Sequence, residues 1–433
     1  MTKNEEYGKK AQTLIPAGAH TYSRTDEVFP SNAPRVIDHS KGVYTWDVDG
    51  NKYLDYGMAC RSVTIGYDYE RISDAAIAQI RNGNTATKAS KVEVDAAETL
   101  CNLIPWVDMV KFAKNGSTVT SAATKLARAY TGRKYIARCK DHSFFSYDDW
   151  FIGDTVMDGG IPEDIKKLTL QFNYNDVESV RSLFEQYKGQ IACLIMEPAE
   201  AEEPRDDFLQ KVRDFCTEYG VVYILDEMIS GFRWDLLGAC NYYGVEPDLV
   251  TYGKGMANGF SVAALGGKRE IMELGGLIPG KERVFLISTT HGAEMSSLGA
   301  FIETIRVYKE LNVTEHIWRI GKKLTSGLTE IAKENGLENF FYVQGADCSP
   351  NFIVCDKNMQ PSLEYRTVFC QEMIRQGVLF PYLSIAYEHG EKEVNVTLDA
   401  ARKAMKVYAD ALNGNLHDFI EGNVIKPVFR KYN

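Results

Sequence analysis

Two short apolar segments, each followed by a reactive side chain, constrain the fold more than any other part of the sequence. The first, Val221–Leu225, ends at Asp226, and the second, Asp248–Tyr252, leads into Lys254, which lies between two glycines. Segments this short and apolar are typical of buried strands. In an open α/β sheet, ligands bind beyond the carboxyl ends of the strands. We therefore expect the carboxylate and the amine to meet at one site.

An amine and a carboxylate at one site suit pyridoxal phosphate (PLP). Lys254 would form a Schiff base with the cofactor's aldehyde, which needs an amine that can lose its proton. Asp226 would pair with the pyridine nitrogen and keep the ring an electron sink. Taken alone, the same spacing also fits a strand that ends at Asp226 and a surface lysine in a turn. Other stretches of the sequence must decide between the two.

The composition is that of an ordinary globular chain. It has 433 residues, 45% of them hydrophobic and 25% charged, which is enough for two or three domains. The net charge is 49 − 59 = −10 without a run of basic residues, which argues against nucleic acid or an anionic membrane as a general partner. No apolar run has the length of a membrane span, and the N-terminus lacks a signal-peptide core. Nine scattered cysteines without a CxxC pair indicate free thiols in a cytoplasmic protein, with no metal site.

Strand-like and helix-like segments alternate along most of the chain. Strands are expected at residues 109–113, 133–138, 191–196, 221–225, 248–252 and 285–287, and helical spacing at 72–103, 293–310, 313–335, 363–376 and 394–412. This alternation predicts an α/β fold with a mainly parallel, doubly wound central sheet.

The two ends of the chain predict a smaller α+β domain. Alternating residues around Asp49-Gly50 are typical of a hairpin. We expect an arm and hairpin over residues 1–60, a large domain over 61–312, and a C-terminal small domain over 313–433.

The turn Asn115-Gly116-Ser117-Thr118 connects a predicted strand to a predicted helix. A glycine and hydroxyls at the start of a helix leave free N–H groups and a positive dipole end, which favour phosphate. Asn and Ser are also ordinary N-cap residues. This turn by itself leaves both interpretations open.

Two further polar residues have open roles. Arg24, in the N-terminal arm, is either a solvated residue or a ligand for an anion. Glu202 lies in the acidic segment Glu200–Asp207, which is either a solvated loop or one through which Glu202 faces a ligand.

Several short motifs resemble one family when they are taken together. They are Val48-Asp49-Gly50, Asn115-Gly116-Ser117 with Leu126-Ala127-Arg128, Asp226-Glu227 with Gly231-Phe232-Arg233, Tyr242-Tyr243-Gly244-Val245 with Pro247-Asp248-Leu249, and Gly253-Lys254. With them the chain resembles the class III (fold-type I) PLP-dependent aminotransferases, and within these the glutamate-1-semialdehyde 2,1-aminomutase branch. The likeness extends from about Gly18 to about Tyr408. The sequence does not indicate a role for the C-terminal tail that follows.

The resemblance implies a role for each residue around the cofactor. Lys254 would be the Schiff-base lysine and Asp226 the partner of the pyridinium nitrogen. Gly116 and Ser117 would hold the phosphate. Met228 lies where the family packs an apolar side chain against one face of the ring.

Two more residues are placed by the resemblance. His142 aligns with the family's ring-stacking aromatic residue. Thr289 matches the threonine that reaches the phosphate of the neighbouring subunit, which implies a homodimer with shared active sites.

The departures from the aminomutase branch concern the substrate. Cys60-Arg61 replaces a Trp-Gly pair, which should widen the pocket and adds a cation. The loop after His142, which corresponds to the mutase's gating loop, is shorter. Phe380–His389 is also shorter and lacks the substrate glutamate. Glu202 stands where transaminases with an external donor keep a glutamate.

These departures favour a ping-pong aminotransferase. It would move an amino group from an amino-acid donor, L-glutamate, to a small anionic aldehyde or keto acceptor such as a sugar or sugar-acid derivative. Arg24, Arg61 and Glu202 would be the substrate residues, although Arg61 equally fits a pairing with a protein carboxylate. The first alternative is the aminomutase, which needs no external donor. The second is a non-enzymatic binding module on the same fold, against which the intact lysine and aspartate argue.

Overall fold

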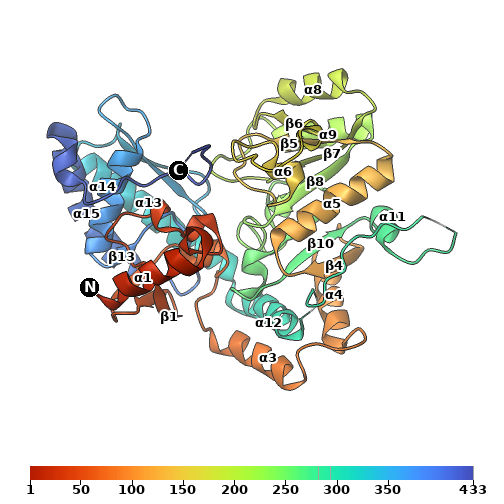
Figure 1. The fold of residues 1–433 in the computed structure, drawn as a ribbon, viewed down its shortest axis with the longest axis horizontal. Helices are drawn as coiled ribbons and strands as arrows, with labels where there is room; N and C mark the ends of the chain where they lie inside the picture. Colours follow the sequence, from red (N-terminus) through yellow and green to blue (C-terminus); the bar gives the residue numbers. More distant parts are fainter. Residues whose placement is uncertain (281, 293, 433) are drawn as a thin grey trace. The chain divides into compact units, whose positions relative to one another are not determined.

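The computed structural model describes residues 1–280, 282–292 and 294–432 and shows two compact units. The first unit combines Met1–Tyr69 with Glu315–Val428. The second consists of Glu70–Thr314 and the end of the chain from Phe429. Each unit has its own sheet (Figure 1).

The second unit is built on a seven-stranded sheet in the order β4-β10-β9-β8-β7-β5-β6. The strands are β4 (Met109–Ala113), β5 (Tyr135–Cys139), β6 (Thr169–Phe172), β7 (Ile191–Met196), β8 (Val222–Glu227), β9 (Leu249–Tyr252) and β10 (Ala263–Gly267). Strand β10 runs antiparallel to both of its neighbours, and the pairs from β9 to β6 are parallel. The predicted α/β fold with a mainly parallel sheet is confirmed.

Helices cover both faces of this sheet because its central strands are apolar on both sides. Cys193 and Ile195 of β7 join a core cluster with helix α5 (Gly116–Thr131), whereas Leu194 and Met196 join one with α8 (Val177–Gln186) and α9 (Phe208–Tyr219). Successive side chains of a strand point to opposite faces. The result is a three-layer α/β/α arrangement (Figure 1).

The other helices of the second unit lie around this sheet. They are α3 (Glu70–Arg81), α4 (Lys91–Leu103), α6 (Asp149–Ile152), α7 (Glu163–Lys166), α10 (Ala239–Tyr242), α11 (Arg269–Met272) and α12 (Met295–Leu311), with 3-10 turns η4 (Lys254–Ala257) and η5 (Glu273–Gly275).

The first unit contains the predicted hairpin. Strands β2 (Tyr44–Asp47) and β3 (Lys52–Asp55) pair antiparallel in a sheet of order β1-β2-β3-β13. The other elements of the first unit are β1 (Ile37–Lys41), β11 (Phe341–Gln344), β12 (Asn351–Val354), β13 (Val378–Leu379), α1 (Lys3–Leu14), α2 (Met58–Arg61), α13 (Val313–Glu334, whose first residues belong to the second unit), α14 (Leu363–Arg375), α15 (Glu391–Asn413), η1 (Pro16–Gly18), η2 (Tyr22–Arg24), η3 (Asp26–Val28) and η6 (Leu416–Phe419). Strands β11 and β12 form a separate two-stranded sheet.

Some predicted elements differ from the structure. Residues 285–287 form no strand, because three apolar residues in a polar stretch find no strand partner there. The helical region from Ile72 to Leu103 is two helices, α3 and α4, separated by residues 82–90. The helix expected from Ala293, which lies outside the described residues, begins at Met295. Strands β6 and β10 were not predicted.

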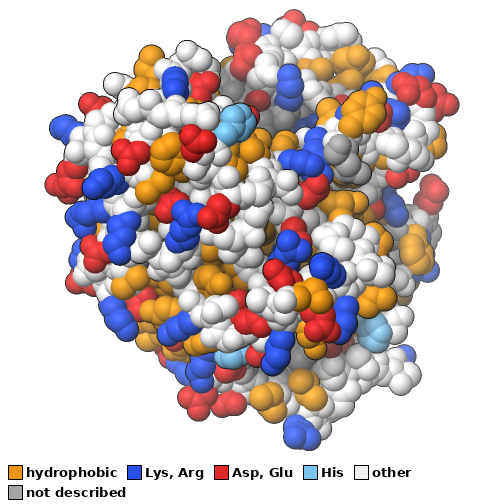
Figure 2. All heavy atoms as spheres, turned by 60° about the vertical axis from the view of Figure 1, so that its left-hand side comes forward, with side chains coloured by type: hydrophobic (Ala, Val, Ile, Leu, Met, Phe, Trp, Pro, Cys, Tyr) orange, Lys and Arg blue, Asp and Glu red, His pale blue; other side chains and the backbone are white. Residues whose placement is uncertain are grey.

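The surface and the thiols agree with the composition. Figure 2 shows basic and acidic side chains interspersed over the face that it presents. All nine cysteines are free, and the described residues contain no His, Cys, Asp and Glu cluster able to hold a metal ion. A membrane-spanning helix is absent from the described part of the chain.

Candidate active site

The two predicted strands lie side by side and bring a carboxylate and a hydroxyl together. Asp226 of β8 is in register with Thr251 of β9. Oδ1 of Asp226 accepts a hydrogen bond of 2.9 Å from the Thr251 hydroxyl and one of 3.0 Å from the Met228 amide. Both hydrogen bonds are accepted by Oδ1, so Oδ2 can accept a hydrogen bond from a further donor.

The Asp226 carboxyl is buried, with 2% of its surface exposed. Burial raises its pKa to about 6, although the bonds from Met228 and Thr251 and the charge of Lys254 each lower it. A buried carboxylate is stabilised by a cationic donor. The site therefore favours a positively charged N–H opposite Asp226.

Lys254 follows β9 and begins the 3-10 turn η4. Its φ is +42°, a left-handed conformation that costs energy for a residue with a side chain. Its charge lowers the pKa of Asp226, so the two side chains interact electrostatically. Such strain is common at functional sites, where the surrounding structure holds it in place.

The predicted phosphate turn opens helix α5. Asn115 caps the helix by accepting from the Thr118 amide at 3.0 Å. The amides of Gly116 and Ser117 come before Thr118 and have no partner within the helix. The buried Ser117 oxygen accepts from the Tyr147 amide at 3.1 Å, so its hydroxyl proton can still be donated.

Met228 links this turn to the lysine. A Cβ atom on Gly116 would lie 3.0 Å from the Met228 sulfur, and one on Gly253 would lie 2.5 Å from it. Both glycines are therefore in close contact with the thioether, and a side chain at Gly253 would need Met228 to move. The structure thus brings Gly116, Met228 and the residue before Lys254 together.

His142 is buried and neutral. Burial, together with the nearby charge of Arg138, lowers its pKa to about 3. Its Nδ1 accepts from the Glu197 amide at 3.0 Å, and its ring lies 4.9 Å from that of Tyr174. The imidazole is therefore an uncharged aromatic ring held in a fixed position.

The remaining predicted residues of the second unit lie on exposed loops. The Glu202 side chain is 56% exposed and contacts Arg205 at 2.6 Å. Thr289 is exposed in a turn in which its carbonyl accepts from the Gly292 amide at 3.2 Å. Neither has a contact with Asp226 among the described residues.

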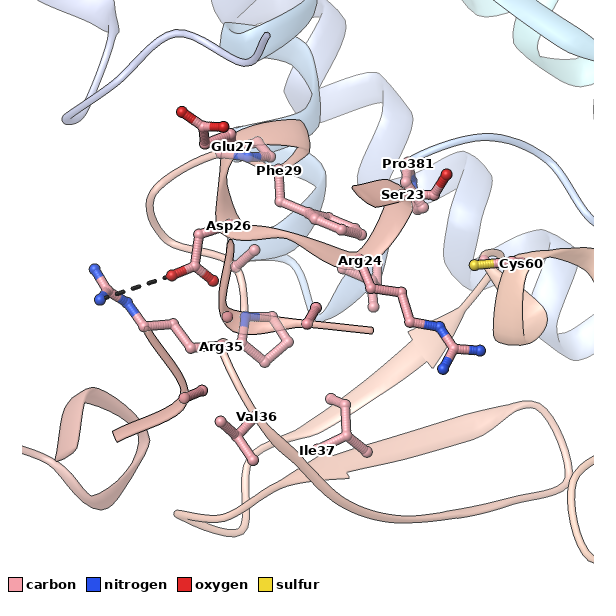
Figure 3. A pocket seen from close by; sticks show the side chains of 18 of the residues that line it. Ser23, Arg24, Asp26, Glu27, Phe29, Arg35, Val36, Ile37, Cys60 and Pro381 are labelled. Carbon is pink, nitrogen blue, oxygen red and sulfur yellow. Dashed lines mark ion pairs between the residues drawn. The ribbon is translucent and has the colours of Figure 1, made fainter. Parts of the chain in front are cut away.

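Arg24 and Arg61 belong to the first unit. Arg24 ends η2, is exposed, and forms a hydrogen bond with Cys60. Arg61 ends the segment α2, in which all four residues have φ between +40° and +66°. Its guanidinium lies 5.1 Å from the centre of the Tyr382 ring. Arg24 contacts Cys60 (Figure 3), Arg61 lies at the Tyr382 ring, and Cys60 and Tyr382 interact with each other. The two predicted substrate residues Arg24 and Arg61 therefore lie in the same part of the first unit.

Three residues were missed by the sequence analysis. Thr251 could have been found, because a strand residue in register with Asp226 must face the same way. Tyr382 and Tyr147 carry no local signal, since each reaches its partner across long sequence separations.

The residues of the second unit fit PLP. Oδ2 of Asp226 suits a pyridinium nitrogen, Lys254 supplies the amine, and the start of α5 offers amides and a hydroxyl to a phosphate. The missing side chains at Gly116 and Gly253 keep the backbone near Met228 open. A strand end that binds no ligand does not require this combination of features.

Comparison with known proteins agrees with this arrangement. The profile of the family described as aminotransferase class-III matches residues 27–383. A 3-aminobutyryl-CoA aminotransferase from Cloacimonas acidaminovorans (strain Evry) is 32% identical over 407 residues, which covers 92% of this chain and 95% of that protein.

Solved structures share the fold. The FumI protein of Sphingopyxis sp. MTA144, in a form that contains PLP, has a TM-score of 0.87 at 26% identity and covers 95% of this chain and 98% of its own. A glutamate-1-semialdehyde aminomutase from Pseudomonas aeruginosa PAO1 has a TM-score of 0.80 at 16% identity over 94% of each chain. The second likeness shows the fold alone.

Proposed function

The chain belongs to the class-III aminotransferase family and is a PLP-dependent transaminase, and from this premise we propose that it transfers an amino group from L-glutamate to an anionic aldehyde or ketone. The observation that carries the transfer chemistry is the buried Asp226, paired with Thr251 and under the charge of Lys254. The anionic acceptor is supported by Arg24, an exposed cation that contacts the Cys60 thiol and interacts electrostatically with the buried Asp55 carboxyl.

The cofactor, when bound, supplies an electron sink for the negative charge that develops beside the transferred nitrogen. Lys254 would hold it through Nζ, and after donor binding the same atom would take up and return the substrate proton. Asp226 would hold the pyridine nitrogen. The amides at the start of α5 and the Ser117 hydroxyl would hold the phosphate, and His142 and Met228 would enclose the ring.

The relative at 32% identity narrows the acceptor class. It is named for 3-aminobutyryl-CoA, and the phosphates of coenzyme A make such thioesters anionic. We therefore place 3-oxoacyl thioesters of coenzyme A first among the acceptors to be tested, ahead of sugars and sugar acids.

The proposal extends to the domains and the assembly. The large domain expected over residues 61–312 would bind the cofactor, and the flanking segments would form the smaller domain. Thr289 would complete the phosphate site of a second copy, which makes the working enzyme a homodimer.

Separate half-reactions test this function. L-Glutamate alone should bleach the visible absorbance of the bound cofactor and release 2-oxoglutarate, and an acceptor should restore the absorbance. An aminomutase would instead turn over a single amino aldehyde without an external donor. Failure of L-glutamate and of every other amino acid to bleach the cofactor would contradict the proposal.

A further inference from the structure

Three hydroxyl side chains on the first turns of α5 hold the segment Phe145–Trp150, which leads into the short helix α6. They are Ser117, Thr120 and Ser121. Residues 143–148 belong to no helix or strand, so their position depends on such contacts. Both the helix and the segment lie in the second unit, which also contains the residues that would hold the cofactor.

Two of these hydroxyls fix the segment to the helix. The Thr120 hydroxyl donates to the Phe145 carbonyl at 2.8 Å. Oγ of Ser121 lies 3.0 Å from Oγ of Ser146 and accepts from Nε1 of Trp150 at 2.8 Å. Thr120 and Ser146 are completely buried, so a broken bond would leave polar atoms without water or another partner. The segment is therefore held firmly against α5.

The third hydroxyl, that of Ser117, accepts a hydrogen bond from the segment. Its Oγ accepts from the Tyr147 amide at 3.1 Å, and the residue is 5% exposed. Among the described residues, no acceptor takes the Ser117 hydroxyl proton. A buried hydroxyl proton without an acceptor is unfavourable. The side chain is therefore suited to a ligand that brings an acceptor oxygen.

The chain that follows Tyr147 is fixed at a second place. Nε of the buried Arg138 on β5 lies 2.6 Å from Oδ2 of Asp154, and its Nη2 donates to the Asp154 carbonyl at 2.9 Å. The Thr169 hydroxyl of β6 donates to the Trp150 carbonyl at 2.6 Å. Contacts on both sides of Tyr147 therefore restrict the position that its amide can take.

We propose that the segment Phe145–Trp150 is part of the phosphate site, in which the Tyr147 amide orients the Ser117 hydroxyl toward the cofactor's phosphate. The inference rests on the proposed function, which places the phosphate at the start of α5. The amide occupies one side of the Ser117 oxygen, so the hydroxyl proton must point elsewhere. A hydroxyl that accepts a hydrogen bond is also polarised and donates more strongly. Tyr147 is thus a positioning residue that acts through its backbone.

Calorimetric titration of the full chain, freed of cofactor, tests this assignment without turnover. The two probes are pyridoxamine 5′-phosphate and pyridoxamine, which share the ring and the amine and differ only in the phosphate. Neither probe needs a Schiff base with Lys254. Ser117→Ala should lower the affinity for pyridoxamine phosphate about tenfold, because a hydrogen bond to a charged group is lost, and change that for pyridoxamine by less than about twofold.

A pair of variants isolates the Tyr147 amide. Tyr147→Pro removes the amide hydrogen, and Tyr147→Ala, which also loses the phenol ring but keeps that hydrogen, is its reference. Tyr147→Pro should bind pyridoxamine phosphate roughly fivefold more weakly than Tyr147→Ala, with equal affinities for pyridoxamine. When Ser117→Ala is added to both, this difference should vanish, because the amide acts through the hydroxyl. Equal losses for the two probes, or a difference that persists without the hydroxyl, would overturn the proposal.

If Tyr147→Pro fails to fold, as judged by its melting temperature, Thr120→Val replaces it. This change removes the donor to the Phe145 carbonyl and loosens the segment. It should weaken binding of pyridoxamine phosphate, and the effect should again vanish when Ser117→Ala is added. Thr304→Val is the matched control, since this buried hydroxyl donates to the Ala300 carbonyl of its own helix, α12.

The same titrations separate this inference from the proposed function. If Ser117→Ala leaves the affinity for pyridoxamine phosphate unchanged, the proposed position of the phosphate and the inference are both wrong. If Ser117→Ala weakens binding but Tyr147→Pro and Thr120→Val do not, the phosphate position stands and the orienting role of the segment is refuted. The L-glutamate half-reaction of the unaltered protein tests the amino donor independently of either result.

Discussion

The Thr251 hydroxyl donates a hydrogen bond of 2.9 Å to Oδ1 of Asp226, its register partner on the neighbouring strand. The bond ties the carboxylate to the strand that leads directly to Lys254. It also lowers the pKa of a carboxyl that burial raises. Thr251 is thus a positioning residue for the group that would hold the pyridine nitrogen.

Thr251→Val should weaken cofactor binding and lower turnover by about tenfold. Loss of a hydrogen bond to a charged group costs roughly 1.5–3 kcal/mol, and 1.4 kcal/mol is a factor of ten. Cofactor affinity is measured by absorbance titration. Thr304→Val is the matched control, because this buried hydroxyl donates to the Ala300 carbonyl of its own helix. Equal losses in both variants would contradict the role of Thr251.

Asp226→Asn should stabilise the cofactor-free protein increasingly as the pH rises. The folded-state pKa of Asp226 lies at about 6, above its usual value of 3.8. The unfolded chain therefore loses this proton first, and the wild-type protein loses stability as the pH rises from about 4 to about 6. The loss levels off above that range.

Two pKa units correspond to roughly 3 kcal/mol, so the advantage of the amide should grow by about 1–2 kcal/mol between roughly pH 5 and pH 8. Urea unfolding of the apo proteins at several pH values measures it. Asp164→Asn, whose side chain is 98% exposed, is the control and should show no such growth. A pH-independent difference would mean that Asp226 is not held with a raised pKa.

In the holoenzyme, Asp226→Asn should lower the rate of turnover roughly a hundredfold or more, because an amide cannot hold the pyridine proton.

Lys254→Ala should abolish turnover and leave a cofactor that can be washed out, since both the covalent attachment and the proton-carrying amine are lost. Borohydride reduction of the wild-type holoenzyme, followed by peptide mapping, should place the label on Lys254. Lys268→Ala removes a lysine of the same unit that pairs with Asp248 at 2.6 Å, and it should keep activity. A label on another lysine would refute the assignment.

Gly253→Ala should weaken cofactor binding because its Cβ would lie 2.5 Å from the Met228 sulfur. Overpacking of this kind costs roughly 1–3 kcal/mol. Adding Met228→Ala should restore part of the affinity by removing the clash, and titrations of the single and double variants measure this. Gly159→Ala, where no atom lies within 4 Å of the new Cβ, serves as the control. If Met228→Ala does not restore affinity, the loss of cofactor binding comes from the backbone of Gly253 rather than from the clash with Met228.

Thr289→Ala should weaken cofactor binding mainly in the assembled dimer. If the turn donates to the phosphate of the partner copy, a ligand that binds only the dimer stabilises it by mass action. Removing the cofactor should then raise the dimer dissociation constant. Sedimentation with and without cofactor measures this, and a monomer that binds the cofactor at full strength would rule out a shared site.

Local sequence patterns predicted the sheet well where strands are apolar. The expected strand at 191–196 is β7 itself, because six consecutive buried residues suit a strand covered on both faces. Strand β10 escaped prediction because its Ala and Gly residues have low strand propensity. It forms since β4 and β9 supply hydrogen-bond partners on both sides. The expected strand at 285–287 had the right composition but lacks such partners.

The sequence by itself determined which reactive groups stand at the strand ends, Asp226 and Lys254 above all, because strand patterns and motif spacing are local properties. The tertiary structure decided the state of those groups. Burial sets the pKa of Asp226 and keeps His142 neutral, and register selects Thr251 as the donor. It also placed the segment Phe145–Trp150 along the first turns of α5. These properties depend on residues far apart in the chain, whose contacts exist only after the chain has folded.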